Sequence, residues 1–148
     1  GESVSSLEFE KKPTLLVFYL GFGCSHCVRQ LAVIEPETDK FKELGINIAA
    51  VSTETIEELA ASNKASEILG SLSFPLMADP QLRVFKQFRA YDDFEQTPLH
   101  GTFLIDGEGK VRWQDISYEP FTDIEFLLKE SKRLLSQPKA TDLAGGIE

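Results

Sequence analysis

The sequence predicts an α/β fold, a three-layer α/β/α sandwich in which helices flank a mixed central sheet of about five strands. Residues 14–20 form a continuous apolar run, which is typical of a parallel strand covered on both faces. Further short apolar runs alternate with segments of helical periodicity, and this alternation favours a mainly parallel sheet. Both cysteines, Cys24 and Cys27, follow the first run, at the edge where open α/β sheets collect their active sites.

The composition is that of one ordinary globular domain. With 148 residues, of which 42% are hydrophobic, the chain is long enough to bury its own core. The formal net charge is −9, which argues against nucleic acid as a partner. The longest apolar run, residues 15–22, is too short to span a bilayer, so we expect no membrane insertion in this segment. Two cysteines make no disulfide framework, so they do not indicate in which cellular compartment the protein works. It could be cytoplasmic, or exported as part of a longer precursor.

Three parts are expected along the chain. Residues 1–12 form an N-terminal edge segment, and residues 13–136 form the folded domain. Residues 137–148, which are Pro, Gly and polar residues for the most part, form a flexible tail or linker. Within the domain, the helix that begins at Ser25 is expected to be kinked or broken at Pro36.

Turn and cap signals place the remaining elements. Thr55, with Glu58 three residues later, predicts a capping box at the start of a helix over 56–69. The other expected elements are, in chain order, a strand at 46–51, a strand at 74–77, a helix from Asp79–Pro80 to Phe88, a loop at 90–100, a strand at 101–106, a turn at 107–109, a strand at 110–116 and a helix from Thr122. The order β-α-β-α-β-α-β-β-α means that the late hairpin adds an antiparallel edge to the sheet.

The two cysteines form a C-x-x-C between a strand and the start of a helix. Unpaired N–H groups and the positive end of the helix dipole stabilise a thiolate there, so Cys24 is expected to be the reactive thiol. Cys27 lies one helical turn later on the same face, close enough to form a disulfide with Cys24. A thiolate that attacks and a neighbour that resolves are the parts of dithiol–disulfide exchange, so the pattern favours a redox enzyme.

Two other interpretations of the cysteines stay open. Cysteine is often buried and inert, but the glycine-rich approach to the motif argues against two structural thiols. A structural zinc site takes four ligands, and only His26 and His100 remain as further candidates. We therefore expect neither a metal nor a cofactor.

The residues between and before the thiols are candidates for tuning them. As a cation or donor beside the first thiolate, His26 would lower the pKa of Cys24 and make the disulfide more oxidising. The alternative is that His26 is an exposed first-turn residue with little effect. Gly23 and Ser25 complete the immediate surroundings of Cys24.

With these motifs the chain resembles the thioredoxin-like superfamily, and within it the alkyl-hydroperoxide-reductase/thiol-specific-antioxidant branch of peroxiredoxin-like redoxins. The resemblance implies a thioredoxin-like fold and antioxidant redox activity at the C-x-x-C. The segments that carry it are residues 13–19 leading into Cys24–Cys27, residues 48–52, residues 74–80 and residues 102–111.

The chain departs from these relatives next to the thiols. Peroxiredoxins place a Thr that helps to hold the peroxide three residues before the peroxidatic Cys, and this chain has Gly21 there. Thioredoxins usually place Trp before the first Cys, where this chain has Gly23, and some have a buried acid where it has Phe18. Periplasmic disulfide-introducing enzymes have a similar Cys-x-His-Cys, with Pro in the place of Ser25.

The resemblance also implies a residue that faces the thiols from a later strand. Three residues before the position of Phe103, thioredoxin-like reductases have a cis-Pro and peroxiredoxins an Arg, and this chain has His100. His100 is therefore expected to line the thiol pocket, the alternative being that it only ends a loop. Thr97–Pro98 would supply the cis-Pro instead if the loop is longer here.

Charged and aromatic residues outside the motif have ordinary interpretations. The aromatic residues Phe88, Tyr91 and Phe94 are expected to pack in the core, the alternative being that they border the thiol site and bind a partner. The acidic residues expected to form solvated faces are Glu54, Glu57, Glu58, Asp92, Asp93 and Glu95.

The leading functional expectation is a thiol–disulfide oxidoreductase, in which Cys24 attacks a partner disulfide and Cys27 displaces the product. The alternative is a peroxiredoxin-like thiol peroxidase, with Cys24 oxidised by a hydroperoxide and Cys27 resolving the sulfenic acid. A third possibility is a redox-sensing or inert interaction domain of a larger protein. The expected partners are protein or small-molecule disulfides, hydroperoxides in the alternative, and an unidentified thiol electron donor or acceptor.

Overall fold

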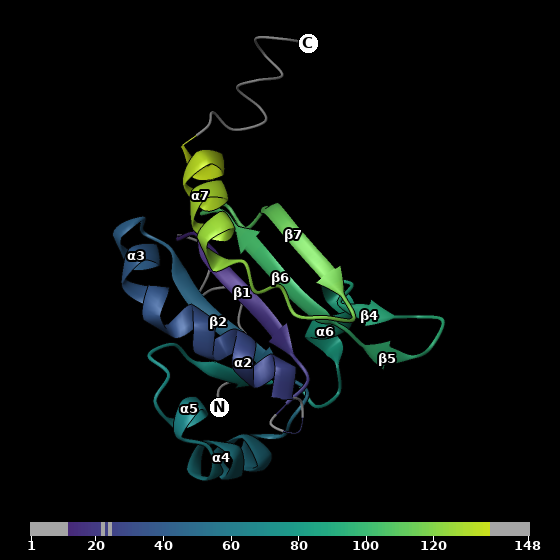
Figure 1. Ribbon diagram of the computed structural model, residues 1–148. Helices are drawn as coiled ribbons and strands as arrows, with labels where there is room; N and C mark the ends of the chain where they lie inside the picture. The colour runs from purple at the N-terminus through teal and green to yellow at the C-terminus, as the bar shows by residue number, and fades with distance from the viewer. Residues whose placement is uncertain (1–11, 22, 24, 137–148) are drawn as a thin grey trace.

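A five-stranded mixed sheet forms the centre of the protein, in the strand order β3-β2-β1-β6-β7 (Figure 1). The computed structural model describes residues 12–21, 23 and 25–136, except for the side chains of residues 25–27. Nearly all of the predicted N-terminal segment and the whole predicted tail lie outside these residues. The strands are β1 (Thr14–Tyr19), β2 (Asn47–Ser52), β3 (Leu76–Ala78), β6 (His100–Ile105) and β7 (Val111–Ser117).

β1 is the middle strand, as expected from its continuous apolar sequence. All six of its residues are buried, because helices cover one face of the strand and aromatic side chains the other. It runs parallel to β2, with Tyr19 opposite Ser52, and antiparallel to β6, with Phe18 opposite Gly101. The predicted sheet of mixed direction with a late antiparallel hairpin is therefore confirmed.

Helices cover the two faces of the sheet unequally (Figure 1). Five helices contribute buried residues to one apolar core, whereas α6 (Arg83–Gln87) packs Phe85 into a second core on the other face. In that second core the ring of Phe18 meets those of Phe85 and Phe103 edge-on, with centroids 4.9 and 5.4 Å apart. The five helices are α2 (Ser25–Ile34), α3 (Thr38–Glu43), α4 (Ile56–Ala65), α5 (Glu67–Gly70) and α7 (Ile124–Leu135).

The local sequence signals for helix breaks and caps act as expected in most places. Pro36 lies in a 3-10 turn, Glu35–Glu37, that separates α2 from α3. The capping box forms at the start of α4, where Thr55 Oγ1 accepts from the N–H of Glu58 at 3.1 Å and the Glu58 carboxylate accepts from that of Thr55 at 2.9 Å. The single helix predicted over 56–69 is wrong, because Ser66 ends α4 and its hydroxyl accepts from Leu69 N–H to begin α5.

Two later helices begin at other residues than predicted. The Asp79 carboxylate accepts hydrogen bonds from the N–H groups of Arg83, Val84 and Phe85 at 3.0, 2.9 and 3.0 Å, so it caps α6 from four residues upstream. The last helix, α7, is capped by Asp123 rather than by Thr122. A carboxylate satisfies the free N–H groups at a helix start as well as a threonine hydroxyl does.

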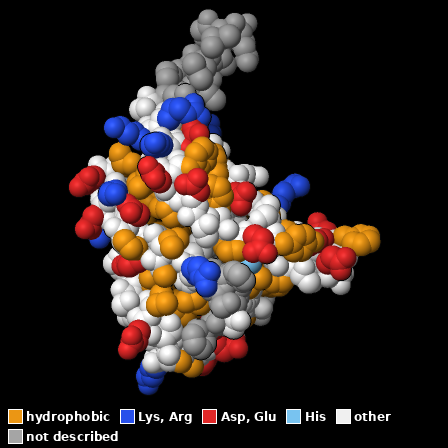
Figure 2. Space-filling view, viewed as in Figure 1, with side chains coloured by type: hydrophobic (Ala, Val, Ile, Leu, Met, Phe, Trp, Pro, Cys, Tyr) orange, Lys and Arg blue, Asp and Glu red, His pale blue; other side chains and the backbone are white. Residues whose placement is uncertain are grey.

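The segment predicted as a loop at 90–100 contains a two-stranded ribbon, so that prediction is partly wrong. β4 (Tyr91–Asp92) pairs with β5 (Thr97–Pro98), and the ribbon projects from the edge of the molecule (Figure 1). Its base is held by the Tyr118 hydroxyl, which donates to Asp92 Oδ2. The space-filling view shows hydrophobic and acidic side chains along this projection (Figure 2). None of the helices in the described part of the chain has the length and apolar character needed to cross a membrane.

Candidate active site

The central strand leads the chain to the start of α2 at the carboxyl edge of the sheet. β1 ends at Tyr19 and α2 begins at Ser25, the residue that follows Cys24 in the sequence (Figure 1). The predicted order of strand, C-x-x-C and helix is therefore present. The first turn of α2 carries no acidic residue, so the positive end of its dipole is not neutralised from within the helix. Such a position favours a thiolate.

The residues of the motif itself are described only in part. Gly23 is exposed. Cys24 lies outside the described residues, and so do the side chains of Ser25, His26 and Cys27. The disulfide, the tuning role of His26 and the alternative that His26 is simply exposed remain predictions.

A buried glutamine holds α2 against the sheet. Gln30, 1% exposed, donates from Nε2 to Thr102 Oγ1 at 3.1 Å and to the carbonyl oxygen of Phe121 at 2.8 Å. These bonds join α2 to β6 and to the segment that precedes α7. Because Gln30 lies in the same helix as Cys27, they also set the position of the helix start relative to the sheet.

His100 is the first residue of β6 and lies beside the carboxyl end of β1. Gly101 pairs with Phe18, so His100 comes one residue beyond that pair, where β1 runs into the loop before Cys24. Its ring is buried, and Nδ1 lies 3.0 Å from the carbonyl oxygen of Tyr118. A carbonyl oxygen only accepts hydrogen bonds, so Nδ1 is the donor. His100 is thus a buried, oriented imidazole at the same edge of the sheet as the cysteine motif.

Thr97 and Pro98 are not a second candidate for that position. They form β5, in which Pro98 pairs with Tyr91 of the projecting ribbon, and Thr97 is exposed. The described residues contain no cis peptide bond, so the alternative in which Thr97–Pro98 supplies a cis-Pro is not supported. His100 rather than Pro98 comes next to β1 because the extra residues of the loop fold back on themselves as the ribbon.

Glu54 is the residue of this edge that sequence reasoning missed. It was expected on a solvated face, but its side chain is half-buried beyond the end of β2. Ser52 Oγ donates to Oε1 at 2.8 Å, and Ser62 Oγ of α4 donates to Oε2 at 2.7 Å. A Ser-x-Glu directly after a buried strand, next to the strand that carries the cysteines, is the signal that could have found it.

The Glu54 side chain packs against the loop that leads to the cysteines. Gly21 has a φ of +100°, and a Cβ added there would lie 3.1 Å from Glu54 Cγ and 3.2 Å from Cδ. Next to Glu54, Thr53 Oγ1 donates to the carbonyl oxygen of Leu20 at 3.2 Å. The two residues after β2 therefore fix the backbone at Leu20 and Gly21.

A buried tyrosine completes this polar cluster. Tyr19 is fully buried, and its hydroxyl has no hydrogen-bond partner of good geometry among the described residues. Burial raises the pKa of Tyr19 well above that of an exposed tyrosine, and the charge of Glu54 adds to this, while the neighbouring Ser52 hydroxyl works in the opposite direction. The Tyr19 hydroxyl therefore stays protonated at physiological pH.

The three aromatic residues near the ribbon have different environments. Phe88 packs against Phe18 and Phe103 with centroids 5.3 and 5.2 Å away, as expected of a core residue. The ring of Tyr91 lies 4.9 Å from Lys86 Nζ, a cation–π contact at the base of the ribbon. Phe94 is 92% exposed, so the expectation that it packs in the core is wrong.

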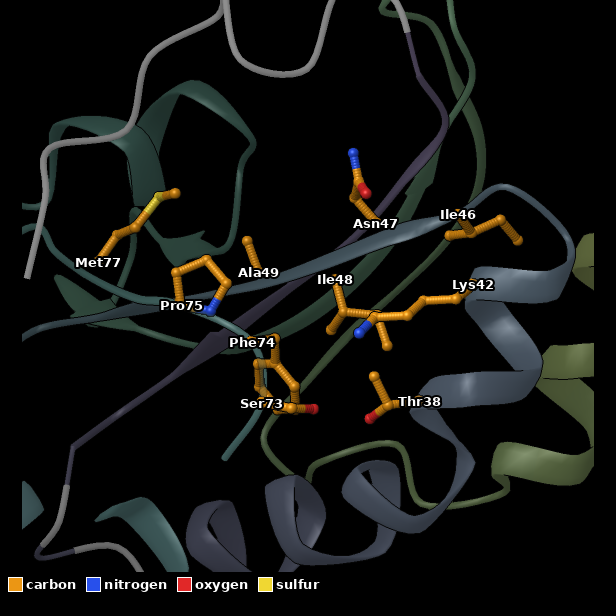
Figure 3. Close-up of a pocket in the computed structure, with 10 residues that line it drawn as sticks. All are labelled: Thr38, Lys42, Ile46, Asn47, Ile48, Ala49, Ser73, Phe74, Pro75 and Met77. Carbon is orange, nitrogen blue, oxygen red and sulfur yellow. The ribbon is translucent and has the colours of Figure 1, made fainter. Parts of the chain in front are cut away.

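The pocket drawn in Figure 3 is not part of this site. It has a volume of about 250 Å³ and lies where β2 begins, between α3 and the segment before β3. Lys42 and Thr38 line it from α3, Ile48 from β2, and Phe74 and Pro75 from the other side (Figure 3). β1 and β2 are parallel, so this pocket is at the opposite edge of the sheet from Tyr19 and Ser52.

Comparison with known proteins decides the family. The family model described as "AhpC/TSA family" matches residues 1–114 of the chain. The chain belongs to the AhpC/TSA family. This is the peroxiredoxin branch of the thioredoxin-like superfamily, whose members are thiol-based antioxidant enzymes, so the resemblance seen in the sequence is confirmed at this level.

Individual relatives in the AhpC/TSA family are distant. The chain is 27% identical to alkyl hydroperoxide reductase C of Ferdinandcohnia aciditolerans over 116 residues, which are 78% of this chain and 69% of the relative. It is 26% identical to alkyl hydroperoxide reductase C of Amphibacillus xylanus over 114 residues, 77% of this chain and 61% of the relative. The chain thus spans about two thirds of the length of these enzymes.

Solved structures support the same fold. The AhpC of Enterococcus faecalis superposes with a TM-score of 0.80 at 21% identity, covering 88% of this chain and 78% of that one. The reduced 2-Cys peroxiredoxin of Plasmodium vivax superposes with a TM-score of 0.77 at 20% identity, covering 88% and 82%. The thioredoxin-like α/β fold expected from the sequence is therefore confirmed.

Proposed function

We propose that the protein is a thiol peroxidase that reduces hydroperoxides, with Cys24 as the peroxidatic and Cys27 as the resolving cysteine. The observation that carries the proposal is that α2 of this AhpC/TSA domain begins at the residue after Cys24, at the carboxyl edge of the central strand. The family membership supports this alternative better than the leading expectation of a disulfide oxidoreductase.

The chemistry uses only the two thiols, a hydroperoxide and a thiol donor. The Cys24 thiolate attacks one peroxide oxygen; an S–O bond forms, the O–O bond breaks, and the other oxygen leaves as alcohol or water after taking a proton. Cys24 is now a sulfenic acid, oxidised by two electrons. Cys27 attacks its sulfur, an S–S bond forms, and water leaves. An external thiol donor then reduces the disulfide by exchange and is itself oxidised.

His100 and the start of α2 are the parts of the chain that assist this reaction. Free N–H groups and the dipole at the helix start favour the Cys24 thiolate. The buried imidazole of His100, oriented by its bond to Tyr118, lies at the same edge and supplies a donor or acceptor to the reacting oxygens.

Direct disulfide exchange is the second candidate, and the geometry at Gly21 favours it. In peroxiredoxins this position is a Thr that helps to hold the peroxide. Here the backbone has a φ of +100° and the space for a side chain is taken by Glu54, so no hydroxyl can reach the site from position 21. A C-x-x-C pair that attacks a partner disulfide needs no such hydroxyl.

A stopped-flow experiment on the reduced protein separates the two candidates. One arm mixes it with hydrogen peroxide or an alkyl hydroperoxide and the other with a protein disulfide such as insulin, with Cys24→Ser as the control. Rapid oxidation by hydroperoxide that is lost in Cys24→Ser supports the peroxidase. Slow oxidation by both peroxides together with rapid exchange with insulin would instead indicate a thiol–disulfide oxidoreductase. No reaction in either arm would indicate that the protein is an interaction domain.

A further inference from the structure

The polar cluster at the carboxyl ends of β1 and β2 has no part in the steps above. Both oxygens of the Glu54 carboxylate accept a hydroxyl hydrogen bond, from Ser52 at 2.8 Å and from Ser62 at 2.7 Å, and its own N–H donates to Ser52 Oγ at 3.0 Å. The carboxylate thus accepts one hydroxyl hydrogen bond on each oxygen. Among the described residues, no Lys, Arg or His forms an ion pair with it. The two hydroxyl groups therefore hold the carboxylate in place, and no cation among the described residues compensates its charge.

This charge is held close to the cysteine motif. The Glu54 side chain contacts Gly21, and Gly21 precedes Cys24 by three residues. Three extended residues span at most about 11 Å, so the Cys24 backbone lies within about that distance of Gly21 whatever path the chain takes. A Debye length at physiological salt is about 8 Å, and charges that are partly buried are screened less than that.

The buried Tyr19 hydroxyl is a second sign that the cluster has a purpose beyond packing. It is fully buried beside Ser52 and has no hydrogen-bond partner of good geometry within the described part of the chain. Unsatisfied buried polar groups are rare because they cost stability, and they concentrate where function keeps them.

We propose that Glu54 is a positioning residue of the redox site: its side chain packs against the Gly21 backbone in the loop that leads to Cys24, and its negative charge opposes ionisation of the thiols. The helix start favours the thiolate and Glu54 disfavours it, so the two together keep the attacking thiol from becoming too weak a nucleophile. The inference rests on the proposed redox function of the cysteines, but it applies equally to peroxide reduction and to disulfide exchange.

None of the described side chains that face Glu54 adds a charge to the cluster at physiological pH. β1 contributes Tyr19, which stays protonated because burial raises its pKa. β2 contributes Ser52 and α4 contributes Ser62, neither of which titrates. In the described residues around Glu54, no other titratable group takes part in the cluster.

Two variants of Glu54 separate its charge from its packing. Glu54→Gln keeps the size of the side chain and removes the charge, whereas Glu54→Asp keeps the charge and withdraws it from Gly21 by one methylene. Glu57→Gln is the matched control, because Glu57 is an exposed acid in the first turn of α4. All are made in a Cys27→Ser background, so that Cys24 is the only thiol. The readout is the rate of alkylation of Cys24 by iodoacetamide as a function of pH.

Below the thiol midpoint, Glu54→Gln should alkylate about 2- to 10-fold faster than its parent, which is the effect of removing one charge that acts across roughly 10–15 Å. Glu57→Gln should match the parent, and Glu54→Asp should stay closer to the parent than Glu54→Gln does. Identical pH profiles of the alkylation rate for Glu54→Gln and its parent would overturn the proposal. Equal changes in the alkylation rate for Glu54→Gln and Glu54→Asp would also overturn it, because they would indicate an effect of packing alone. Alkylation uses neither peroxide nor disulfide, so this result is independent of the stopped-flow outcome.

A measurement on the unsubstituted reduced protein covers the case in which Glu54→Gln does not fold. If the carboxylate opposes thiolate formation, ionisation of the thiols must perturb the carboxylate by the same coupling free energy. The ¹³C signal of the Glu54 side-chain carboxyl should therefore shift as the thiols titrate, while that of Glu57 should not. A Glu54 carboxyl chemical shift that does not change as the thiols titrate would overturn the proposal.

Discussion

A Cβ atom at Gly21 would lie 3.1 Å from Glu54 Cγ, closer than side chains normally pack, so any other residue at position 21 would have to displace the Glu54 side chain. The backbone there has a φ of +100°, a conformation that side-chain-bearing residues rarely adopt. The backbone conformation therefore favours glycine three residues before Cys24, and the contact with Glu54 adds to this preference. The loop before the cysteine motif is thus packed against a residue that follows the neighbouring strand β2.

Gly21→Ala should destabilise the protein by about 2–4 kcal/mol, because the costs of backbone strain and of overpacking add. Gly45→Ala is the matched control: its φ is +77°, but a Cβ there meets nothing within 4 Å, so it should cost only about 1–2 kcal/mol. Urea unfolding followed by the fluorescence of Trp113 measures both. Equal losses in the two variants would mean that contact with Glu54 adds nothing, and adding Glu54→Ala to Gly21→Ala should recover the difference.

Gln30 provides a test of how α2 is anchored. Gln30→Met keeps the volume of the side chain and removes both hydrogen bonds, so the carbonyl oxygen of Phe121 loses its donor in a partly buried site. We expect a loss of about 2 kcal/mol in the free energy of unfolding. The Trp113 ring packs on Phe121 with centroids 5.0 Å apart, so its fluorescence also reports this change locally.

Gln87→Met, at an exposed position of α6, is the control and should change stability by less than about 0.5 kcal/mol. If Gln30→Met were as stable as the parent, the two hydrogen bonds would contribute no net stability, and the position of α2 would have to depend on its apolar contacts alone.

Much of the fold could be predicted from the sequence because its signals are local. The apolar run of β1, the break at Pro36 and the Thr55 capping box each depend on residues within one element or its ends. The ribbon at 90–100 escaped prediction because its anchor, the bond from Tyr118 to Asp92, joins residues far apart in the chain. A distant partner leaves no periodic pattern in the sequence.

The parts of the candidate site that could be predicted from the sequence are also the parts that depend on local patterns. The order of strand, cysteine motif and helix is a local pattern. The expectation that His100 lines the thiol pocket came from the family resemblance at Phe103, and it stays a prediction, although His100 does lie beside the carboxyl end of β1. Glu54 looked like one more surface acid, because Ser52 is its only polar partner nearby in the sequence. Its contact with Gly21 arises from the parallel pairing of β1 with β2, which brings the two strand ends together only in the folded chain.

His100 provides a test of the thiol pocket that leaves the fold intact. In His100→Asn the amide nitrogen takes about the place of Nδ1 and keeps the bond to the Tyr118 carbonyl oxygen, while the rest of the imidazole is removed. We expect the second-order rate of oxidation by hydroperoxide to fall about 10²-fold, the lower end of what a positioned acid–base group contributes. The stopped-flow assay used for the parent measures it.

His100→Ala loses the bond as well and should be less stable than His100→Asn by about 1 kcal/mol, while reacting equally slowly. A His100→Asn protein that is oxidised as fast as the parent would show that the imidazole has no part in the reaction. In that case His100 would have a structural role, which includes holding the beginning of β6 to Tyr118.

The bond between Asp92 and Tyr118 should make the projecting ribbon sensitive to pH. The Tyr118 hydroxyl and then the N–H groups of Glu95 and Phe94 stabilise the ionised carboxylate, which lowers the pKa of Asp92. A carboxyl whose pKa is lower in the folded state stabilises the fold above its unfolded pKa of about 3.9, and loses this contribution as the pH falls through the folded value. The ribbon should therefore be held at neutral pH and loosen in acid.

The same hydrogen bond should also change the titration of Tyr118 at alkaline pH. The hydrogen bond to Asp92 raises the pKa of Tyr118, so its hydroxyl should stay protonated beyond the ordinary value of about 10. NMR of the tyrosine ring carbons should show Tyr118 titrating at higher pH than an exposed tyrosine, and Asp92→Asn should return it to the ordinary range. Asp93→Asn, one residue along and exposed, should leave the Tyr118 titration unchanged.

Similar titration curves of Tyr118 in the two variants would mean that the charge of Asp92 does not act on Tyr118. The ribbon would then have to be held by its own β4–β5 pairing.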